Sequence, residues 1–317
     1  MGFEGIIGHE NIKKQLLSSI KENKLNHAHL ISGEDGIGKS LLGKNLAIEI
    51  LGKTLYKEYI DILEWRVSAN KKSIGVEEIR LLIEEVNKKP YEGDKKVILI
   101  YEGEKMTVQA QNALLKTVEE PPIGIYIIIL CDNIESILGT IKSRCQIHNL
   151  QRLSYDEMDK YLHKRYNNLS QEQIKTLISF TDGVPGRAEK YLEDENYIKI
   201  RENVLKIFYQ VTSEESLDLL KNIPFLMENK LNYREVLTWF LSFIRDVLVY
   251  KETQDKSIII NKDKIEEIKG LASLFSFSKL NAIIKIIEHA RINLYNNVNE
   301  AFTFQSMLLN MQEVFYG

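Results

Sequence analysis

The chain has 317 residues, enough for two or three domains, and its composition is ordinary for a globular protein, with 44% hydrophobic and 27% charged residues. A formal net charge of −3 argues against a strong, independent nucleic-acid binder, and the two cysteines, Cys131 and Cys145, are too few for a disulfide framework. No apolar run has the length of a membrane span, and the first residues lack the basic-then-apolar form of a signal peptide. We therefore expect a cytoplasmic protein with no membrane partner.

The first part of the chain alternates strand patterns with helix patterns. The predicted helices cover residues 10–20, 39–51, 76–87, 108–120 and 134–143, and the predicted strands cover residues 27–32, 59–65, 97–100, 125–130 and 145–150. Two of the strands, 97–100 and 125–130, are apolar throughout, as in a parallel sheet that is covered on both faces. This order predicts a doubly wound α/β domain.

After residue 150 no strand pattern returns. Ser154 and Glu157 form a capping-box pattern at the start of a helix. A glycine- and proline-containing break at residues 182–186 precedes a series of amphipathic helices, which are clearest at 233–250, 278–295 and 300–315. The sequence therefore predicts three parts: an α/β domain at 1–150, a small helical lid at 151–195 and a larger helical domain at 196–317.

A phosphate-binding loop lies between the first predicted strand and the helix that follows it. Residues 33–40 fit the pattern G-x-x-x-x-G-K-[ST] at its fixed positions Gly33, Gly38, Lys39 and Ser40, and Gly36 is a further glycine of the loop. Glycines let backbone N–H groups curl around phosphate oxygens, the lysine reaches the β- and γ-phosphates, and the serine hydroxyl faces Mg²⁺. The loop therefore predicts binding of ATP or ADP with Mg²⁺.

Several further motifs resemble the clamp-loader subunits of bacterial DNA polymerase III, which are AAA+ ATPases. They are the lead-in at 3–10, the segment QNALLKTVEEPP at 111–122, the triplet Ser143-Arg144-Cys145, and Asn297-Val298-Asn299 before the last helix. The resemblance spans almost the whole chain. It implies a P-loop AAA+ domain, a helical lid and a C-terminal collar domain through which subunits assemble.

Within that family the chain resembles the delta-prime type more than the motor type. Motor subunits end the strand at 97–100 with Asp-Glu, of which the aspartate anchors the magnesium shell and the glutamate polarises the attacking water. Here the pair is Tyr101-Glu102, and a phenol is a poor ligand for a hard cation. We expect slow or absent hydrolysis with weak or static nucleotide binding. The alternative is an autonomous motor-type ATPase that uses Glu102 with a substitute metal ligand.

The resemblance also implies partners and further site residues. The partners are the motor (tau/gamma) and delta subunits, and through the complex the sliding clamp and primed DNA. Arg144 corresponds to an arginine finger that acts on the nucleotide of a neighbouring subunit. Arg187 lies where the lid has a nucleotide-sensing arginine, with a surface residue as the alternative. Asn133 lies where a polar sensor follows a strand, with a turn-forming role as the alternative.

Two features concern zinc and DNA. Many relatives carry a four-cysteine zinc module before the second strand, but residues 52–59 contain no cysteine, so no zinc is expected. The pairs Lys71-Lys72, Lys88-Lys89 and Lys95-Lys96 either contact a DNA backbone or are ordinary solvated charge, and no aromatic residues interleave with them to support base stacking.

Overall fold

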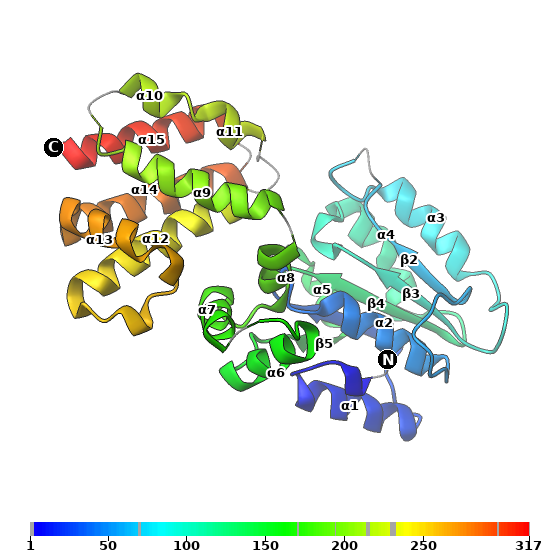
Figure 1. Ribbon diagram of the computed structural model, residues 1–317. Helices are drawn as coiled ribbons and strands as arrows, with labels where there is room; N and C mark the ends of the chain where they lie inside the picture. The colour runs from blue at the N-terminus through cyan, green and yellow to red at the C-terminus, as the bar shows by residue number, and fades with distance from the viewer. Residues whose placement is uncertain are drawn as a thin grey trace. The chain divides into compact units, whose positions relative to one another are not determined.

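The structure is a computed structural model that describes residues 3–68, 71–169, 171–193, 195–213, 216–228, 233–296 and 298–316. The chain forms two compact units (Figure 1). The first contains Met1–Leu169 and Thr181–Arg187, and the second contains Ser170–Phe180 and Ala188–Gly317. The three-part division at 1–150, 151–195 and 196–317 stays a prediction.

The first unit is built on a five-stranded sheet in the order β2-β3-β4-β1-β5, and each neighbouring pair is parallel. The strands are β1 (Ala28–Ser32), β2 (Ile62–Trp65), β3 (Lys96–Ile100), β4 (Ile125–Cys131) and β5 (Gln146–Asn149). The parallel α/β architecture that the sequence predicts is confirmed. Since the strands run the same way, the segments that follow β1, β3 and β4 meet at one edge of the sheet.

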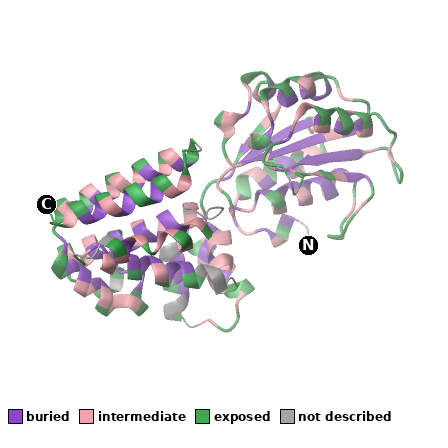
Figure 2. Cartoon of the chain, turned by 90° about the horizontal axis from the view of Figure 1, so that it is seen from above, coloured by how far each residue is buried: buried purple, intermediate pink, exposed green. Residues whose placement is uncertain are grey.

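Helices cover both faces of this sheet (Figure 1). They are α1 (Glu10–Lys21), α2 (Lys39–Ile50), α3 (Val76–Val86), α4 (Val108–Glu119) and α5 (Gly139–Lys142), and the same unit also contains α6 (Tyr155–Arg165). Short 3₁₀ turns lie at η1 (Phe3–Gly5), η2 (Gly103–Lys105) and η3 (Ile134–Ser136). Alternate strand residues face opposite ways, so Leu99 packs in the cluster around α2 whereas Ile98 packs in the cluster around α3 and α4. The three central strands, β1, β3 and β4, are accordingly buried along most of their length (Figure 2).

The second unit is helical in its described residues. Its helices are α7 (Gln171–Thr181), α8 (Pro185–Glu193), which begins in the first unit, α9 (Glu195–Gln210), α10 (Ser216–Leu220), α11 (Ile223–Glu228), α12 (Tyr233–Thr253), α13 (Ile265–Leu274), α14 (Phe277–Tyr295) and α15 (Glu300–Tyr316), with 3₁₀ turns η5 (Lys256–Ile258) and η6 (Lys262–Lys264). Phe208, Trp239 and Phe240 are fully buried in its core. The three clearest predicted helices correspond to α12, α14 and α15, while Asn297 lies outside the described residues.

One property of the helices bears on membranes. In the stretches that the structure describes, no single helix combines the length and apolarity that a bilayer span requires. One sharply bent pair, Lys262–Leu274 with Phe277–Tyr295, meets the length and composition criteria only when its two helices are taken together.

Candidate functional site

The phosphate loop connects β1 directly to α2, as the sequence predicts. β1 ends at Ser32, and α2 begins at Lys39 with Gly38 as its N-cap. Gly36 and Gly38 have φ values of 82° and 104°, in the left-handed region that side chains rarely tolerate. This backbone places the loop at the N-terminus of α2, where N–H groups and the helix dipole favour an anion. Ser40 is exposed in the first turn of that helix, so its hydroxyl is accessible.

Lys39 is nearly buried, with 9% of its side chain exposed, and its ammonium group has three partners. It donates hydrogen bonds to the backbone oxygens of Gly33 (2.9 Å) and Glu34 (2.8 Å). Its third contact is a 2.7 Å ion pair with Asp132, which follows β4 at the same edge of the sheet. The predicted phosphate-binding lysine is therefore charge-paired within its own chain.

Asp132 and Asn133, which directly follow β4, make different contacts. Asn133 accepts a hydrogen bond from Glu135 N–H (3.0 Å) and so caps the turn η3, which is the turn-forming alternative for this residue. Asp132 makes the contact to Lys39, and its backbone N–H donates to the side chain of Glu104 (3.0 Å). Burial raises the pKa of Glu104. The sequence analysis did not identify Asp132 or Glu104, although both follow strands that end beside the loop.

Arg187 also lies at the phosphate loop. Its guanidinium group makes an ion pair with Glu34 (3.1 Å), a residue of the loop itself. Arg152, which the sequence analysis missed, contacts the other carboxylate oxygen of Glu34 (2.6 Å) and also pairs with Asp182. The residue before Arg187, Gly186, donates its N–H to Gly36 O (2.9 Å).

That backbone contact requires two glycines. A Cβ atom added to Gly186 would lie 2.6 Å from the Cα of Gly36, which is too close for any side chain. The start of α8 therefore lies directly against the tip of the phosphate loop, and Arg187 is carried to Glu34 by this approach.

Both residues of the pair at the end of β3 make contacts within the chain. The Tyr101 side chain is buried, and its hydroxyl donates to Glu64 (3.0 Å). Glu64 also pairs with Lys44 (2.9 Å), and the Arg66 guanidinium lies 3.4 Å from the Tyr101 ring centroid. Burial, followed by the Glu64 charge, raises the pKa of Tyr101, so the phenol stays protonated.

Glu102, the predicted water-polarising residue, is held by a local contact. Its backbone is left-handed, with φ 52°, which costs a non-glycine residue about 1–2 kcal/mol. Its carboxylate pairs with Lys105, one turn further on. Among the described residues, no three His, Cys, Asp or Glu side chains gather as a metal site. The loop, Lys39 and Ser40 suit a nucleotide phosphate, but β3 offers Mg²⁺ no carboxylate at position 101.

Arg144 lies shortly before β5, at the amino ends of the strands, which is the end opposite the phosphate loop. Its guanidinium donates to Glu119 (3.0 Å), to Thr140 O (3.0 Å) and, at 3.4 Å, to Ser143 Oγ. About a third of its side chain is exposed. Glu119, at the end of α4, thus holds this arginine.

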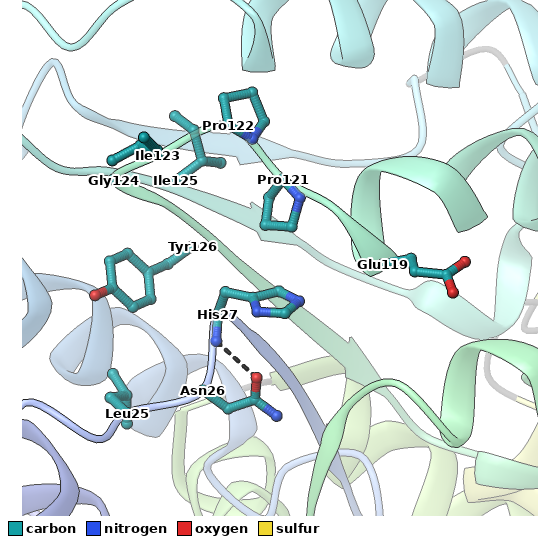
Figure 3. Close-up of a pocket in the computed structure, with 10 residues that line it drawn as sticks. All are labelled: Leu25, Asn26, His27, Glu119, Pro121, Pro122, Ile123, Gly124, Ile125 and Tyr126. Atoms are coloured by element: carbon teal, nitrogen blue, oxygen red, sulfur yellow. Dashed lines mark hydrogen bonds between the residues drawn. The ribbon is translucent and has the colours of Figure 1, made fainter.

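A shallow cavity of about 380 Å³ lies beside Glu119 at the amino ends of β1 and β4 (Figure 3). It is lined by Leu25, Asn26, His27, Glu119, Pro121, Pro122, Ile123, Gly124, Ile125 and Tyr126. The phosphate loop follows the carboxyl end of β1, so this cavity lies at the opposite end of the strands. It is therefore not the predicted nucleotide site.

The parallel sheet, the phosphate loop and the helices that follow them define a P-loop ATPase fold of the AAA+ class. A solved DNA polymerase III gamma subunit-related protein from Thermotoga maritima has the same fold, with a TM-score of 0.54 and 19% identity over 95% of this chain and 99% of its own.

Sequence comparisons give the family. A family model described as DNA polymerase III, delta subunit, matches residues 8–154, and one described as DNA polymerase III, delta subunit, C terminal, matches residues 195–313. The delta-prime subunit of DNA polymerase III from Bacillus subtilis is 28% identical over 95% of each chain. The gamma subunit from Buchnera aphidicola is 27% identical over 97% of this chain and 94% of its own. The chain belongs to the delta-prime clamp-loader subunits of DNA polymerase III.

Proposed function

We propose that this chain is the partner subunit of a DNA polymerase III clamp loader that supplies an arginine finger in trans and contributes little hydrolysis of its own. It works in the cytoplasm with motor (tau/gamma) and delta subunits, and the assembly loads the sliding clamp onto primed DNA during replication. Family membership over both matched regions supports the clamp-loader role. The relatives that are named gamma and tau subunits support the choice of partners.

The position of Arg144 is the observation that carries the trans role. Arg144 precedes β5, whereas the phosphate loop follows β1, and these two strands are parallel neighbours. β1 has five residues at about 3.3 Å each, so roughly 15 Å of sheet separates the two ends. This distance keeps Arg144 away from its own chain's phosphate loop, which supports a nucleotide on a neighbouring subunit as its target.

The chain's own nucleotide site is suited to static binding of ATP or ADP. Gly33, Gly36 and Gly38 would cradle the phosphates, Lys39 would contact them and Ser40 would face Mg²⁺. Arg187 is close enough to join this site, since it already contacts the loop through Glu34. For Asn133, a sensing role competes with its observed role as the cap of η3.

The alternative, a motor-type ATPase, needs a metal ligand near position 101 and a free Glu102. The contact of Tyr101 to Glu64 and the pairing of Glu102 with Lys105 both weigh against it. Phosphate release by the purified chain separates the two readings. Robust turnover that Lys39→Ala abolishes would establish the motor reading.

The trans role is tested in a clamp loader reconstituted with motor and delta subunits, the clamp and primed DNA. We expect Arg144→Ala to lower hydrolysis at one site by about 10³-fold while the complex still assembles, because the cation that stabilises transition-state charge is lost. Lys142→Ala is the matched control, since it removes a positive charge two residues away whose ion pair, among the described residues, is with the exposed Glu135. Unchanged hydrolysis by an assembled Arg144→Ala complex would make Arg144 a purely structural residue.

A further inference from the structure

The phosphate loop of this chain is charge-neutralised by the chain itself. An ammonium group has three N–H donors, and Lys39 has three acceptors within 2.9 Å: two loop carbonyls and the Asp132 carboxylate. A phosphate that enters the loop must therefore take the place of one acceptor. The carboxylate is the one that bears a negative charge and so competes directly with phosphate.

Asp132 is placed so that it can give way without disturbing the sheet. Its side chain is 34% exposed, whereas the Lys39 side chain is 9% exposed. The two carbonyls that bind Lys39 belong to the loop backbone, so their displacement would distort the loop itself. Asp132 is fixed through its backbone N–H, which donates to Glu104 (3.0 Å), and its side chain can rotate away while that bond stays.

The surroundings make a second anion beside Asp132 unfavourable. Glu104 is already close, and it is half-buried. A bound phosphate would place further negative charge beside these two carboxyl groups. The Asp132 charge thus opposes phosphate in two ways, because it occupies Lys39 and it repels the incoming anion.

From this geometry we propose that Asp132 is an affinity-determining residue that occupies Lys39 in place of a nucleotide phosphate. The proposal rests on the nucleotide site described under the proposed function. It predicts that the chain binds nucleotide weakly because of Asp132, although the loop glycines and Lys39 are intact.

The test is calorimetric titration of the full chain with ADP, once with Mg²⁺ and once with EDTA. We expect Asp132→Asn, which keeps the shape and removes the charge, to bind ADP roughly tenfold more tightly than wild type in both buffers, since charge-assisted pairs of this kind contribute about that much. Asp132→Ala, which removes the competing acceptor altogether, should also bind ADP more tightly than wild type in both buffers. Glu77→Gln is the control, because it makes the same charge change in an exposed pair with Arg80 on α3.

The outcomes separate this inference from the nucleotide site itself. Equal or weaker binding by Asp132→Asn, while wild type binds, overturns the inference and leaves the site standing. A loss that appears only with Mg²⁺ overturns it as well, and would make Asp132 a metal ligand. Binding by neither protein refutes both the inference and the site, whereas binding by Asp132→Asn alone supports both. A gain in Glu77→Gln of the same size would reduce the effect to net charge and refute the inference.

Discussion

Tyr101 offers a direct test of the proposal that this chain contributes little hydrolysis of its own. The change to make is Tyr101→Asp, which restores the residue type that motor subunits have at the end of this strand. If the tyrosine merely fills the place of a metal ligand, the aspartate should create an ATPase. The surroundings of Tyr101 predict the opposite outcome, because the position is part of the core beneath α2.

The magnitude follows from the contacts. Tyr101 is 4% exposed, and loss of a buried aromatic ring costs about 3–5 kcal/mol. The new carboxylate would also lie beside Glu64, which now accepts the tyrosine hydroxyl. We therefore expect Tyr101→Asp to lower the free energy of unfolding by at least about 4 kcal/mol and to release no phosphate from ATP. Tyr101→Phe, the matched control, should cost only about 1 kcal/mol, since Lys44 still neutralises Glu64.

The chain provides its own probe for this measurement. It has two tryptophans, and Trp65 lies on β2, where its carbonyl accepts the Tyr101 N–H (2.9 Å). With Trp239 of the second unit replaced by Phe in every variant, urea unfolding followed by Trp65 fluorescence reports on the first unit. A Tyr101→Asp protein that is within about 1 kcal/mol of its reference and hydrolyses ATP would refute this reasoning.

Two further predictions concern buried polar groups. The Nδ1 atom of His29 lies 3.1 Å from the Nε2 atom of His148, and burial lowers the pKa of each histidine to about 4. Both are therefore neutral in the folded state at pH 7. Their contribution to stability is complete above pH 6.5, the pKa in the unfolded chain, and is lost as the pH falls toward 4. Unfolding free energy should thus be lower at pH 5 than at pH 7.5 by roughly 3 kcal/mol, and His148→Gln should flatten that dependence; an equally steep urea-unfolding profile in the variant would contradict it. In the second unit, the buried Arg201 donates hydrogen bonds to Asn261 and, through two nitrogens, to Asp263. Arg201→Met should therefore lower the free energy of unfolding by about 3 kcal/mol, measured by chemical unfolding followed by circular dichroism. A decrease below about 1 kcal/mol would show that packing alone holds this segment.

Local patterns were sufficient to predict the sheet and the phosphate loop, because strand apolarity and the glycine-lysine spacing are properties of short segments. They were not sufficient at residues 134–143, which were predicted as one helix. There the N–H of Leu138 donates to the buried Gln111 side chain (2.8 Å), and the helix is divided into η3 and α5. A contact between distant segments decided this, and no periodicity within the segment contains it.

The lysine pairs show the same limit for function. The sequence suggests that Lys96 is a surface charge, but its side chain is fully buried. Its ammonium group donates to Glu85 O (2.8 Å) and to Lys88 O (3.3 Å), at and just after the end of α3. It therefore stabilises a helix C-terminus and cannot contact DNA. Lys71 pairs with Glu78 (3.0 Å), which reduces its charge available to a DNA backbone.

The same kind of pairing recurs at each charged group that the sequence assigns to nucleotide chemistry. Lys39 is paired with Asp132, Arg187 with Glu34, and Glu102 with Lys105. Arg144 is likewise paired with Glu119. Each charge is thus compensated within the chain. A nucleotide, whether bound by this chain or by a neighbour, must therefore replace an existing ion pair, and the binding free energy it gains there is only the difference between the two ion pairs. That difference is largest for a polyanion that is held at several points at once.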